Sequence, residues 1–306
     1  MIYLIDNGKI EKVNREDVKL NGQNRYWGIF SFNQVEDVQK LNFEKGFLSG
    51  FLLNTATRFE SHDGFDAISY NVMQYGEKQL PVKRVCICMR KDLFVILADN
   101  PEAVLGIVDE ISEDVEKTTI FDRLFYTFLE RTIADDASFL DDIEQEIAEL
   151  EDQMITSSRK NCVVEIISLR KKLMQFKRHY EQIQIMLDAI QENENELIDP
   201  KAMRYFKIFA NRVDRLYHIV LNLRDYVTQV REAYQAEVDI NLNSIMKLFT
   251  VITAIFLPLT LIVGWYGMNL KLPEYGWQYG YPMVILMSVA VVAICLISFK
   301  RHNWFK

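Results

Sequence analysis

Two stretches near the C-terminal end of the chain contain no charged side chain. The first lies between Lys247 and Lys271, and the second lies between Glu274 and Lys300. Each holds about 20 apolar residues, and at about 1.5 Å per helical residue such a stretch crosses a hydrocarbon layer of ~30 Å. A buried helical hairpin is the alternative, but core helices seldom remain free of charge for so long. The pattern therefore predicts two transmembrane helices.

A long amphipathic helix is predicted directly before the first of these stretches. Its apolar residues recur in steps of three and four over about six heptads, which is typical of a coiled-coil-like seam. No Gly or Pro separates the seam from the first span, so we expect one helix that continues to about Val263. The seam consists of Met203, Phe206, Phe209, Val213, Leu216, Val220, Leu223, Val227, Val230, Tyr234, Val238, Leu242 and Ile245.

The middle of the chain is also predicted to be helical. No glycine occurs from Ile107 to Val263, and only Pro200 and Pro258 interrupt this region. Residues ~115–195 are interpreted as an antiparallel helical pair with a turn near Thr156-Ser157-Ser158. Nine of the nineteen residues from 134 to 152 are acidic and none is basic. The second helix of the pair carries Arg170, Lys171, Lys172, Lys177 and Arg178, so the two helices should attract each other.

The first ~105 residues show a different pattern, that of a mixed α/β domain. Four segments rich in β-branched and aromatic residues are bounded by Gly, Pro or Asp-Asn signals, which predicts strands at residues 26–32, 65–73, 82–89 and 93–98. The tripeptide Asn100-Pro101-Glu102 then predicts a helix start, with proline at the first helical position.

Composition adds the compartment and the topology. The 306 residues are 49% hydrophobic and 25% charged, and the formal net charge is −8. The four cysteines fit a reducing compartment, and Cys86 and Cys88 should share one face of a strand. The N-terminus has no signal-peptide pattern. Lys300, Arg301 and Lys306 follow the second span, so the positive-inside rule places both termini in the cytoplasm.

Polar and small residues form a stripe along the first predicted span. They lie three, four or seven positions apart, and therefore share one helix face. Each threonine could instead bond only to its own helix backbone, but that alternative explains a full stripe with Asn at both ends less well. A stripe that faces a shared axis of several helices suits a pore. Its members are Asn243, Thr250, Thr253, Thr260, Gly264 and Gly267, with Asn269 just beyond.

The outer end of this span resembles the signature of CorA-type magnesium channels. The segment Tyr266-Gly267-Met268-Asn269 ends the first of two C-terminal spans. Further matching segments are Phe256-x-Pro258-Leu259-Thr260, Pro273-Glu274, Gly280-Tyr281-Pro282 and the terminal Lys300-Arg301 with Trp304. The order of α/β domain, helical pair, stalk and two spans matches as well, so the resemblance covers essentially the full length.

The resemblance implies a metal path through the membrane. Gly267, Met268 and Asn269 would form the outer selectivity site for a hydrated Mg²⁺, and Asn243, Thr260 and Gly264 would line the pore. Apolar gate residues would be Met246, Phe249 and Leu257. The family more often has Leu in place of Phe249 and Met in place of Leu257. The carboxylates that would bind regulatory Mg²⁺ cannot be assigned from the sequence.

The implied function is passive Mg²⁺ influx driven by the membrane potential and closed by cytoplasmic Mg²⁺. The implied assembly is a funnel-shaped homopentamer in the cell membrane, with no nucleic-acid partner and no small-molecule substrate. Transport of Co²⁺ or Ni²⁺ is also consistent with the family. A zinc or other divalent-cation transporter of the same fold is the first alternative, and a membrane-anchored coiled-coil scaffold is the second. An enzyme is not expected, because no nucleotide loop, nucleophile motif or metal-ligand cluster is present.

The expected organisation joins an α+β cytoplasmic domain to a stalk and two C-terminal transmembrane helices. The membrane part of the stalk helix is expected at about 246–266. The expected segments are an α/β domain at 1–110, the helical pair at 111–199, the stalk and first span at 200–269, an external loop at 270–280, the second span at 281–300 and a basic tail at 301–306.

Overall fold

The computed structural model describes most of the chain and divides it into two compact units. The first unit is Met1–Val230 and the second is Arg231–Lys306. The described residues are 1–6, 9–20, 24–41, 43, 47–53, 56–73, 83–112, 120–156, 162–269 and 276–302.

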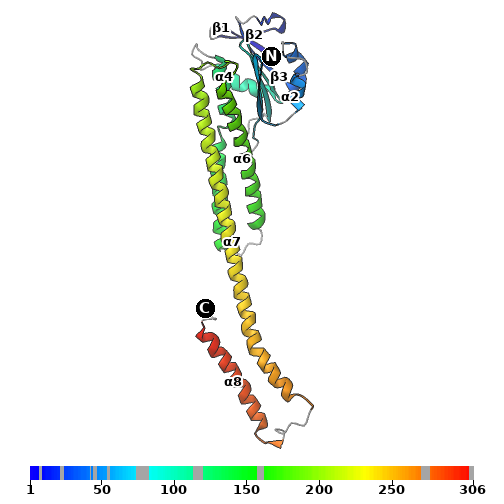
Figure 1. Cartoon of the computed structure of the whole chain (residues 1–306), viewed down its shortest axis with the longest axis vertical. Coiled ribbons are helices and arrows are strands. Elements are labelled where there is room, and N and C mark those ends of the chain that lie inside the picture. Colours follow the sequence, from blue (N-terminus) through cyan, green and yellow to red (C-terminus); the bar gives the residue numbers. More distant parts are fainter. Residues whose placement is uncertain are drawn as a thin grey trace. The chain divides into compact units, whose positions relative to one another are not determined.

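A seven-stranded sheet forms the centre of the N-terminal part of the first unit. Its strand order is β2-β1-β3-β7-β6-β5-β4, and every neighbouring pair is antiparallel except β3 with β7. Figure 1 shows the sheet at the N-terminal end of this unit. The strands are β1 (Ile2–Asp6), β2 (Lys9–Val13), β3 (Arg25–Ser31), β4 (Arg58–His62), β5 (Phe65–Asn71), β6 (Arg84–Met89) and β7 (Leu93–Ala98).

Each face of the sheet is covered by a different set of helices. On one face, Val38, Leu48 and Phe51 of two short helices pack with sheet residues that include Cys86 and Cys88. The two cysteines share this face, as their spacing predicts, because successive strand side chains alternate between faces. On the other face, the Phe94 ring of β7 lies 5.8 Å from the ring of Phe125 in α4. The sheet is therefore the middle layer of three.

The helices account for the rest of the described chain. The short 3₁₀ segments are Arg15–Asp17 and Phe32–Gln34. The α-helices are α1 (Val35–Gln39), α2 (Phe47–Leu53), α3 (Pro101–Ser112), α4 (Ile120–Thr132), α5 (Asp136–Thr156), α6 (Cys162–Glu192), α7 (Met203–Tyr266) and α8 (Gly280–Arg301).

The predicted strands and the predicted helix start are present, with small shifts at their ends. The four predicted strands correspond to β3, β5, β6 and β7, and α3 begins at Pro101. The strands β1, β2 and β4 were missed. Of these, β2 and β4 (Arg-Phe-Glu-Ser-His) are the two edges of the sheet, whereas β1 is a short apolar strand that pairs with β2 and β3. Polar residues at sheet edges weaken the alternation that marks a strand.

The helical pair differs from its prediction at one point. The first predicted helix is two helices, because the chain turns after Thr132 and α5 begins at the buried Asp136. Tyr180 of α6 donates a hydrogen bond of 2.6 Å to Asp136 Oδ2, which holds the break in place. The helix α5 ends at Thr156, and residues 157 and 158 of the predicted turn lie outside the described residues.

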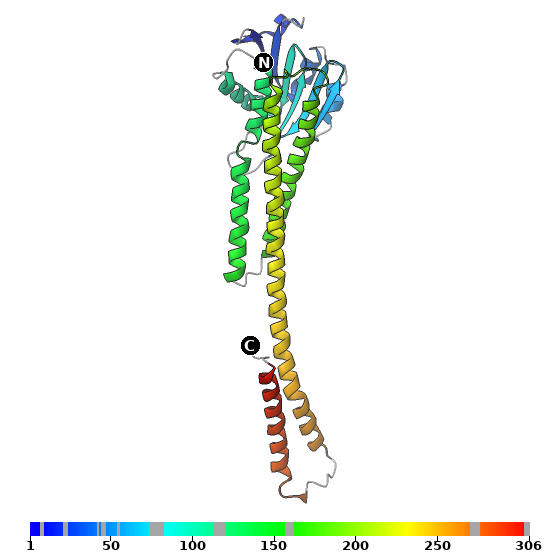
Figure 2. The ribbon, with the colours of Figure 1, turned by 60° about the vertical axis from the view of Figure 1, so that its left-hand side comes forward.

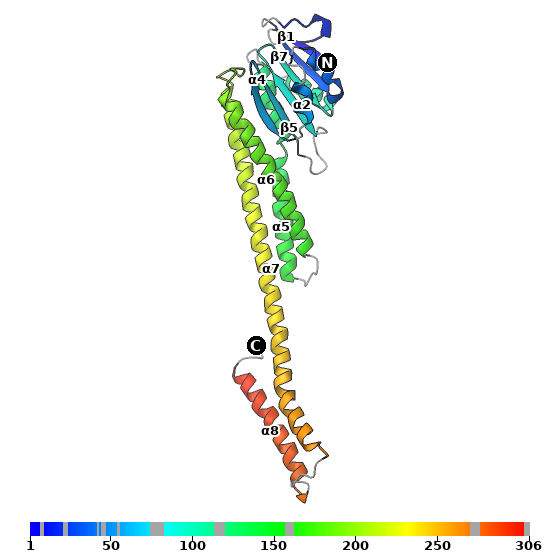
Figure 3. The same cartoon turned by 45° about the vertical axis from the view of Figure 1, so that its right-hand side comes forward.

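The seam of the long helix packs within its own chain over its first part. Its residues from Phe206 to Val230 are buried. The Phe206 ring lies 5.2 Å from that of Phe125, and Tyr226 donates a hydrogen bond of 2.6 Å to Glu151 of α5. Figures 2 and 3 show α5 and α6 beside this part of α7. The predicted seam is therefore a packing surface, and over this part helices of the same chain cover it.

The opposite charge blocks on α5 and α6 do meet, as their composition predicts. Lys172 of α6 forms an ion pair of 2.8 Å with Glu146 of α5. Both side chains are substantially exposed, so the pair contributes only about 0.2–1 kcal/mol. The apolar contacts of Ile143, Ile147 and Leu150, which are buried on α5, therefore dominate the packing of the pair.

Candidate functional site

Two helices that lie in the second unit or extend into it are long and apolar enough to cross a membrane. These are α7, whose most apolar window has a mean hydropathy of 2.2, and α8, with 2.6. Within this unit, α8 lies beside the last part of α7 (Figure 1). The thiol of Cys295 on α8 lies 3.7 Å from the carbonyl oxygen of Ala254 on α7. The two predicted spans are therefore a packed helical hairpin.

The helix α8 covers one face of α7 and leaves the opposite face exposed. The partly buried residues of α7 in this region recur in helical steps, and an α-helix advances about 100° per residue, so they form one stripe. They are Val251, Ala254, Ile255, Pro258, Leu259, Ile262 and Tyr266. Among the predicted pore residues, Leu257, Thr260 and Gly264 lie on the other side of the helix, whereas Asn243, Met246 and Phe249 lie where α7 is exposed on every side. All are exposed, namely Asn243, Met246, Phe249, Leu257, Thr260 and Gly264.

The threonines of the exposed stripe bond to their own helix. The hydroxyls of Thr250, Thr253 and Thr260 donate to the carbonyl oxygens four residues earlier, at 2.8, 2.8 and 2.7 Å. This is the alternative that the sequence left open. It does not remove the threonines from a polar path, because a hydroxyl has one hydrogen and two acceptor sites. With the hydrogen committed, each Oγ1 can interact with a further group only as an acceptor.

A proline interrupts the backbone hydrogen bonds of α7 at the contact with α8. Pro258 has no N–H, so the carbonyl of Ala254 loses its helical partner. The Cys295 thiol donates to that carbonyl at 3.7 Å. In a membrane, such a freed carbonyl must be satisfied by a neighbouring group. The sequence assigned Cys295 only to packing, and no motif could have revealed this contact between the two spans.

The outer end of α7 is closed by a glycine. The N–H of Gly267 donates to the carbonyl oxygen of Val263 at 2.8 Å. A Cβ atom at position 267 would lie only 2.8 Å from the same oxygen, so any side chain would displace the backbone. Gly267 therefore permits the tight turn after which Met268 and Asn269 follow, both of them exposed. Residues 270–275 lie outside the described residues.

The predicted gate residues are exposed apolar side chains on the same side of α7. Met246, Phe249 and Leu257 are 63%, 60% and 67% exposed. Large apolar side chains at such exposure need lipid or protein around them. They lie on the face that carries the polar stripe, which α8 leaves uncovered. In a single copy of the chain, polar and large apolar side chains thus alternate along an exposed face of α7 that α8 does not cover.

No protein site for a bare metal ion is found among the described residues. They contain no group of three or more His, Cys, Asp or Glu side chains arranged to hold a metal. Three glutamates, Glu146, Glu149 and Glu165, line a hollow of about 250 Å³ between α5 and α6. The carboxylates that would sense Mg²⁺ therefore stay unassigned.

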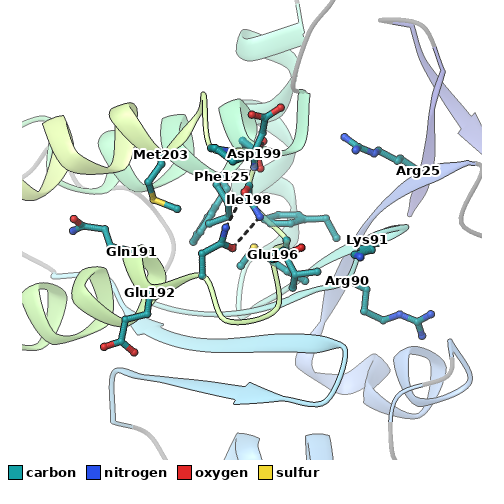
Figure 4. A pocket seen from close by; sticks show the side chains of 16 residues that line it. Arg25, Arg90, Lys91, Phe125, Gln191, Glu192, Glu196, Ile198, Asp199 and Met203 are labelled. Atoms are coloured by element: carbon teal, nitrogen blue, oxygen red, sulfur yellow. Dashed lines mark hydrogen bonds between the residues drawn. The ribbon is translucent and has the colours of Figure 1, made fainter.

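A large cavity lies in the first unit. Its volume is about 920 Å³, and its lining includes Arg25, Lys91 and Asp122 together with the turn between α6 and α7. Figure 4 shows the basic side chains on one side of the cavity and the turn on the other. Burial raises the pKa of Asp122 to about 6, and a hydrogen bond from the backbone N–H of Asp199 acts against that rise.

The fold and the site together define a class of proteins. The chain has two C-terminal helices that are long and apolar enough to span a bilayer and a large N-terminal unit of sheet and helices. A family model described as CorA-like Mg2+ transporter protein matches residues 53–301. The chain belongs to this family, and the resemblance seen in the sequence is confirmed.

Curated relatives and solved structures agree with this assignment. The chain is 28% identical to the cobalt/magnesium transport protein CorA of Thermotoga maritima over 60% of this chain and 52% of the relative. It is 25% identical to the protein of the same description from Methanocaldococcus jannaschii, over 81% and 79%. Thus the match to the first relative spans about half of that protein's length.

The whole-chain structural match supports the fold. The complete structure of the CorA magnesium transporter from Methanocaldococcus jannaschii superimposes with a TM-score of 0.78, covering 99% of this chain and 98% of the other at 20% identity. The full-length CmaX protein matches with a TM-score of 0.72 at 17% identity, over 99% and 97%. The predicted fold class, an α+β domain with a long helix and two C-terminal candidate spans, is therefore confirmed.

Proposed function

We propose that the protein is a homo-oligomeric Mg²⁺ channel whose pore is lined by the exposed face of α7. The observation that carries this proposal is the division of α7 into two faces. Thr260 and Gly264 lie on the face that α8 leaves uncovered, Asn243 lies on the exposed stretch of α7 before it, and Asn269 follows at its outer end. By family resemblance, five copies would place these faces around one axis.

The chemistry of this face suits a hydrated ion. Mg²⁺ sheds its water reluctantly, so a channel can pass it with its first water shell in place. The waters around the ion direct their hydrogens outward, and the pore must supply acceptors. Thr260 Oγ1 is an acceptor because its own hydrogen is bonded to the carbonyl of Phe256 at 2.7 Å. The side-chain carbonyl of Asn269, repeated in each subunit, would supply the outer ring.

The apolar levels between the polar rings would form the gate. Rings of Met246, Phe249 and Leu257 would exclude water when the helices approach, and an ion cannot pass a dry constriction. Phe249 is bulkier than the leucine usual in the family. We therefore infer that a small displacement of α7 suffices to close this pore.

Feedback closure follows from the energetics of passive influx. Moving one elementary charge across 100 mV releases about 2.3 kcal/mol, so a divalent ion gains roughly 5 kcal/mol, a gradient of more than a thousandfold. An open channel would load the cell with Mg²⁺ far beyond need. All but one of the 43 acidic residues precede the first span. Mg²⁺ bound between subunits would neutralise this charge and hold the closed state, and its loss would let the subunits repel.

The first prediction concerns ion flux through purified protein in liposomes. Wild-type protein should carry Mg²⁺ inward when the interior is negative, and Asn269→Ala and Asn243→Ala should each reduce the flux at least about tenfold, because an acceptor ring is lost. Asn241→Ala is the matched control, since Asn241 lies two residues from Asn243 on another side of α7, and it should retain flux. Absent Mg²⁺ flux, or equal flux in all variants, would refute the proposal.

The same assay separates the alternatives. Zn²⁺, Co²⁺ and Ni²⁺ should be tested one at a time and in competition with Mg²⁺. A zinc transporter would carry Zn²⁺ without Mg²⁺, and a membrane-anchored scaffold would carry neither. Met268 favours Mg²⁺, because the zinc-transporting relatives tend to vary the methionine of the tripeptide.

A further inference from the structure

We propose that Asn195 is a positioning residue that fastens the sheet to the start of α7, so that movements of the sheet edge reach the pore helix. This inference rests on the proposed function, because its consequence is a change in gating. Asn195 belongs to the turn between α6 and α7, and its partners belong to the turn between β4 and β5. About 130 residues of sequence separate the two turns.

The Asn195 side chain contacts the β4–β5 turn through both ends of its amide. Nδ2 lies 2.7 Å from Asp66 Oδ1, 2.8 Å from the carbonyl oxygen of His62 and 3.0 Å from Ser61 Oγ. It also lies 3.3 Å from the carbonyl oxygen of Phe65. An amide has two hydrogens, so the two shortest contacts are the main bonds and the others share them.

The other end of the amide completes the contact. The backbone N–H of Gly64 donates to Asn195 Oδ1 at 3.3 Å. The side chain is thus both donor and acceptor to one short turn, which fixes its position in two directions. No apolar or singly charged side chain of similar size could replace it.

The partner of Asn195 is a buried carboxylate. Asp66 is only 3% exposed, and burial raises its pKa. Ser61 Oγ donates to the same Oδ1 at 3.0 Å. A buried carboxylate requires donors, and hydrogen bonds from Asn195 and Ser61 favour its charged form. Removing the amide would therefore leave a buried charge with one fewer donor.

The turn that carries Asn195 is itself held rigidly. Asn193 has a left-handed φ of 46° and closes the turn through two bonds with Ile198, of 2.9 and 3.1 Å. Glu196 has a φ of 49°, a strained value for a residue of this type. Strained backbone persists only where its surroundings fix it, and it gathers at switch regions. Figure 4 shows this turn at Ile198 and Asp199.

The turn leads directly into α7. Asp199 accepts a bond of 2.8 Å from the N–H of Lys201, and its own N–H donates to Asp122 of α4 at 3.3 Å. The helix α7 starts at Met203 and is continuous to Tyr266. The fastened turn therefore lies directly before the helix that carries the candidate pore residues. A displacement of the β4–β5 turn is passed to the beginning of the pore helix.

The test is the concentration of cytoplasmic Mg²⁺ that halves the flux of the full-length protein in liposomes. Asn195→Ala should shift this concentration by about 2- to 30-fold, the usual range for residues that carry coupling, and should leave flux in the absence of cytoplasmic Mg²⁺ unchanged. The exposed Asn33 gives a control, and Asn33→Ala should leave the concentration as in wild type. If this concentration is the same for Asn195→Ala as for wild type, the proposal is overturned.

A second pair of variants separates positioning from general damage. Asn195→Asp places a carboxylate against Asp66, so its shift should be larger at pH 7.5 than at pH 5.5, where the two can share a proton. His62 and Glu194 also influence Asp66 and are present in both variants. Asn195→Ala adds no second carboxylate, so its shift should differ less between the two pH values than that of Asn195→Asp. Adding Asp66→Asn to Asn195→Asp restores an amide facing a carboxylate and should move the concentration back toward wild type. If the half-inhibiting Mg²⁺ concentration of the double variant does not move back toward the wild-type value, the proposal is contradicted.

Hydrogen exchange tests the contact independently of transport. In full-length Asn195→Ala, amides of the β4–β5 turn, including Gly64, and amides of the first turns of α7 should both exchange faster than in wild type. Faster exchange in only one of the two segments, or in neither, would refute the coupling. If wild-type protein carries no Mg²⁺ or is not closed by it, the proposed function fails, and this measurement still decides whether the two segments are coupled.

Discussion

At the scale of single residues, burial decides which polar groups hold the fold. His179 of α6 is 5% exposed, lies near the Tyr70 ring of β5 and has no hydrogen-bond partner for Nε2 among the described residues. Burial lowers its pKa to about 4. Beside it, Tyr70 shares a bond of 2.9 Å with Thr132. The junction of sheet and helices thus contains the imidazole of His179, whose protonated form is disfavoured by burial.

This histidine should make the first unit sensitive to acid. Above pH 6.5 His179 is neutral whether folded or unfolded. As the pH falls from about 6.5 to 4, only the unfolded chain gains the proton, so the free energy of unfolding falls, by roughly 3 kcal/mol in total. Asp122, whose pKa is raised to about 6, acts in the opposite direction. The difference in the free energy of unfolding between wild type and His179→Phe therefore reports the contribution of His179 alone.

The measurement is the melting temperature of full-length protein in detergent between pH 7.5 and 4.5. Wild type should lose stability relative to His179→Phe as the pH falls. His218→Gln is the control, because His218 is 65% exposed and pairs with Asp214. Parallel curves for wild type and His179→Phe would show that the buried imidazole does not govern the acid response.

At the scale of elements, the contact between α7 and α8 depends on one proline and one thiol. Pro258 frees the carbonyl of Ala254, and Cys295 donates to it. The same contact fixes which face of α7 stays open. Rotation of α7 by half a turn would bury the polar stripe against α8 and expose the apolar one. Side-chain chemistry at this single level therefore helps to orient the candidate pore face.

Substitution of Cys295 should weaken this hairpin. Cys295→Ala leaves the Ala254 carbonyl without its donor and should lower the free energy of unfolding by about 1 kcal/mol, whereas Cys295→Ser should retain or improve it, because a hydroxyl is the stronger donor. In a Pro258→Ala background the backbone N–H returns, and the two Cys295 variants should then become equal. Thermal melting of the four proteins measures this coupling, and an unchanged Ala–Ser difference in that background would contradict it.

At the scale of the whole molecule, the charge of the chain should link Mg²⁺ to assembly. The net charge is −8 per subunit, and a ring of copies would repel itself unless cations bind between them. The seam of α7 adds a second reason for assembly. Its buried part ends at Val230, whereas Val238, Leu242 and Ile245 remain 37%, 55% and 49% exposed. These residues continue the same spacing and would find partners in other copies of the proposed assembly.

Mg²⁺ should therefore stabilise the assembled protein beyond the effect of ionic strength. At equal ionic strength, millimolar MgCl₂ should raise the melting temperature of the full-length oligomer by several degrees more than NaCl does, because a ligand that binds only the folded assembly shifts unfolding by mass action. Native mass spectrometry in the same detergent should give five copies. Equal shifts with the two salts would show that Mg²⁺ acts only by screening.

Much of this architecture was predictable because its causes are local. Charge-free length marks the two spans, and steps of three and four mark the long helix, whose seam residues Phe206 to Val230 are buried. The polar edge strands β2 and β4 were missed, since pairing rather than pattern makes them strands, and the short apolar strand β1 was missed with them. The break between α4 and α5 was also missed, because Asp136 is held by Tyr180, which lies 44 residues away.

The sequence by itself determined the family, the two spans and the candidate outer site. Gly267-Met268-Asn269 and the apolar runs are contiguous segments, so they can be recognised without knowing the fold. Tertiary structure alone decided what covers each surface. It placed the α7 seam against α5 and α6, set Cys295 opposite the carbonyl freed by Pro258, and brought Asn195 to the β4–β5 turn. Such contacts join residues 41 to about 130 positions apart, and only the packing of the folded chain brings them together.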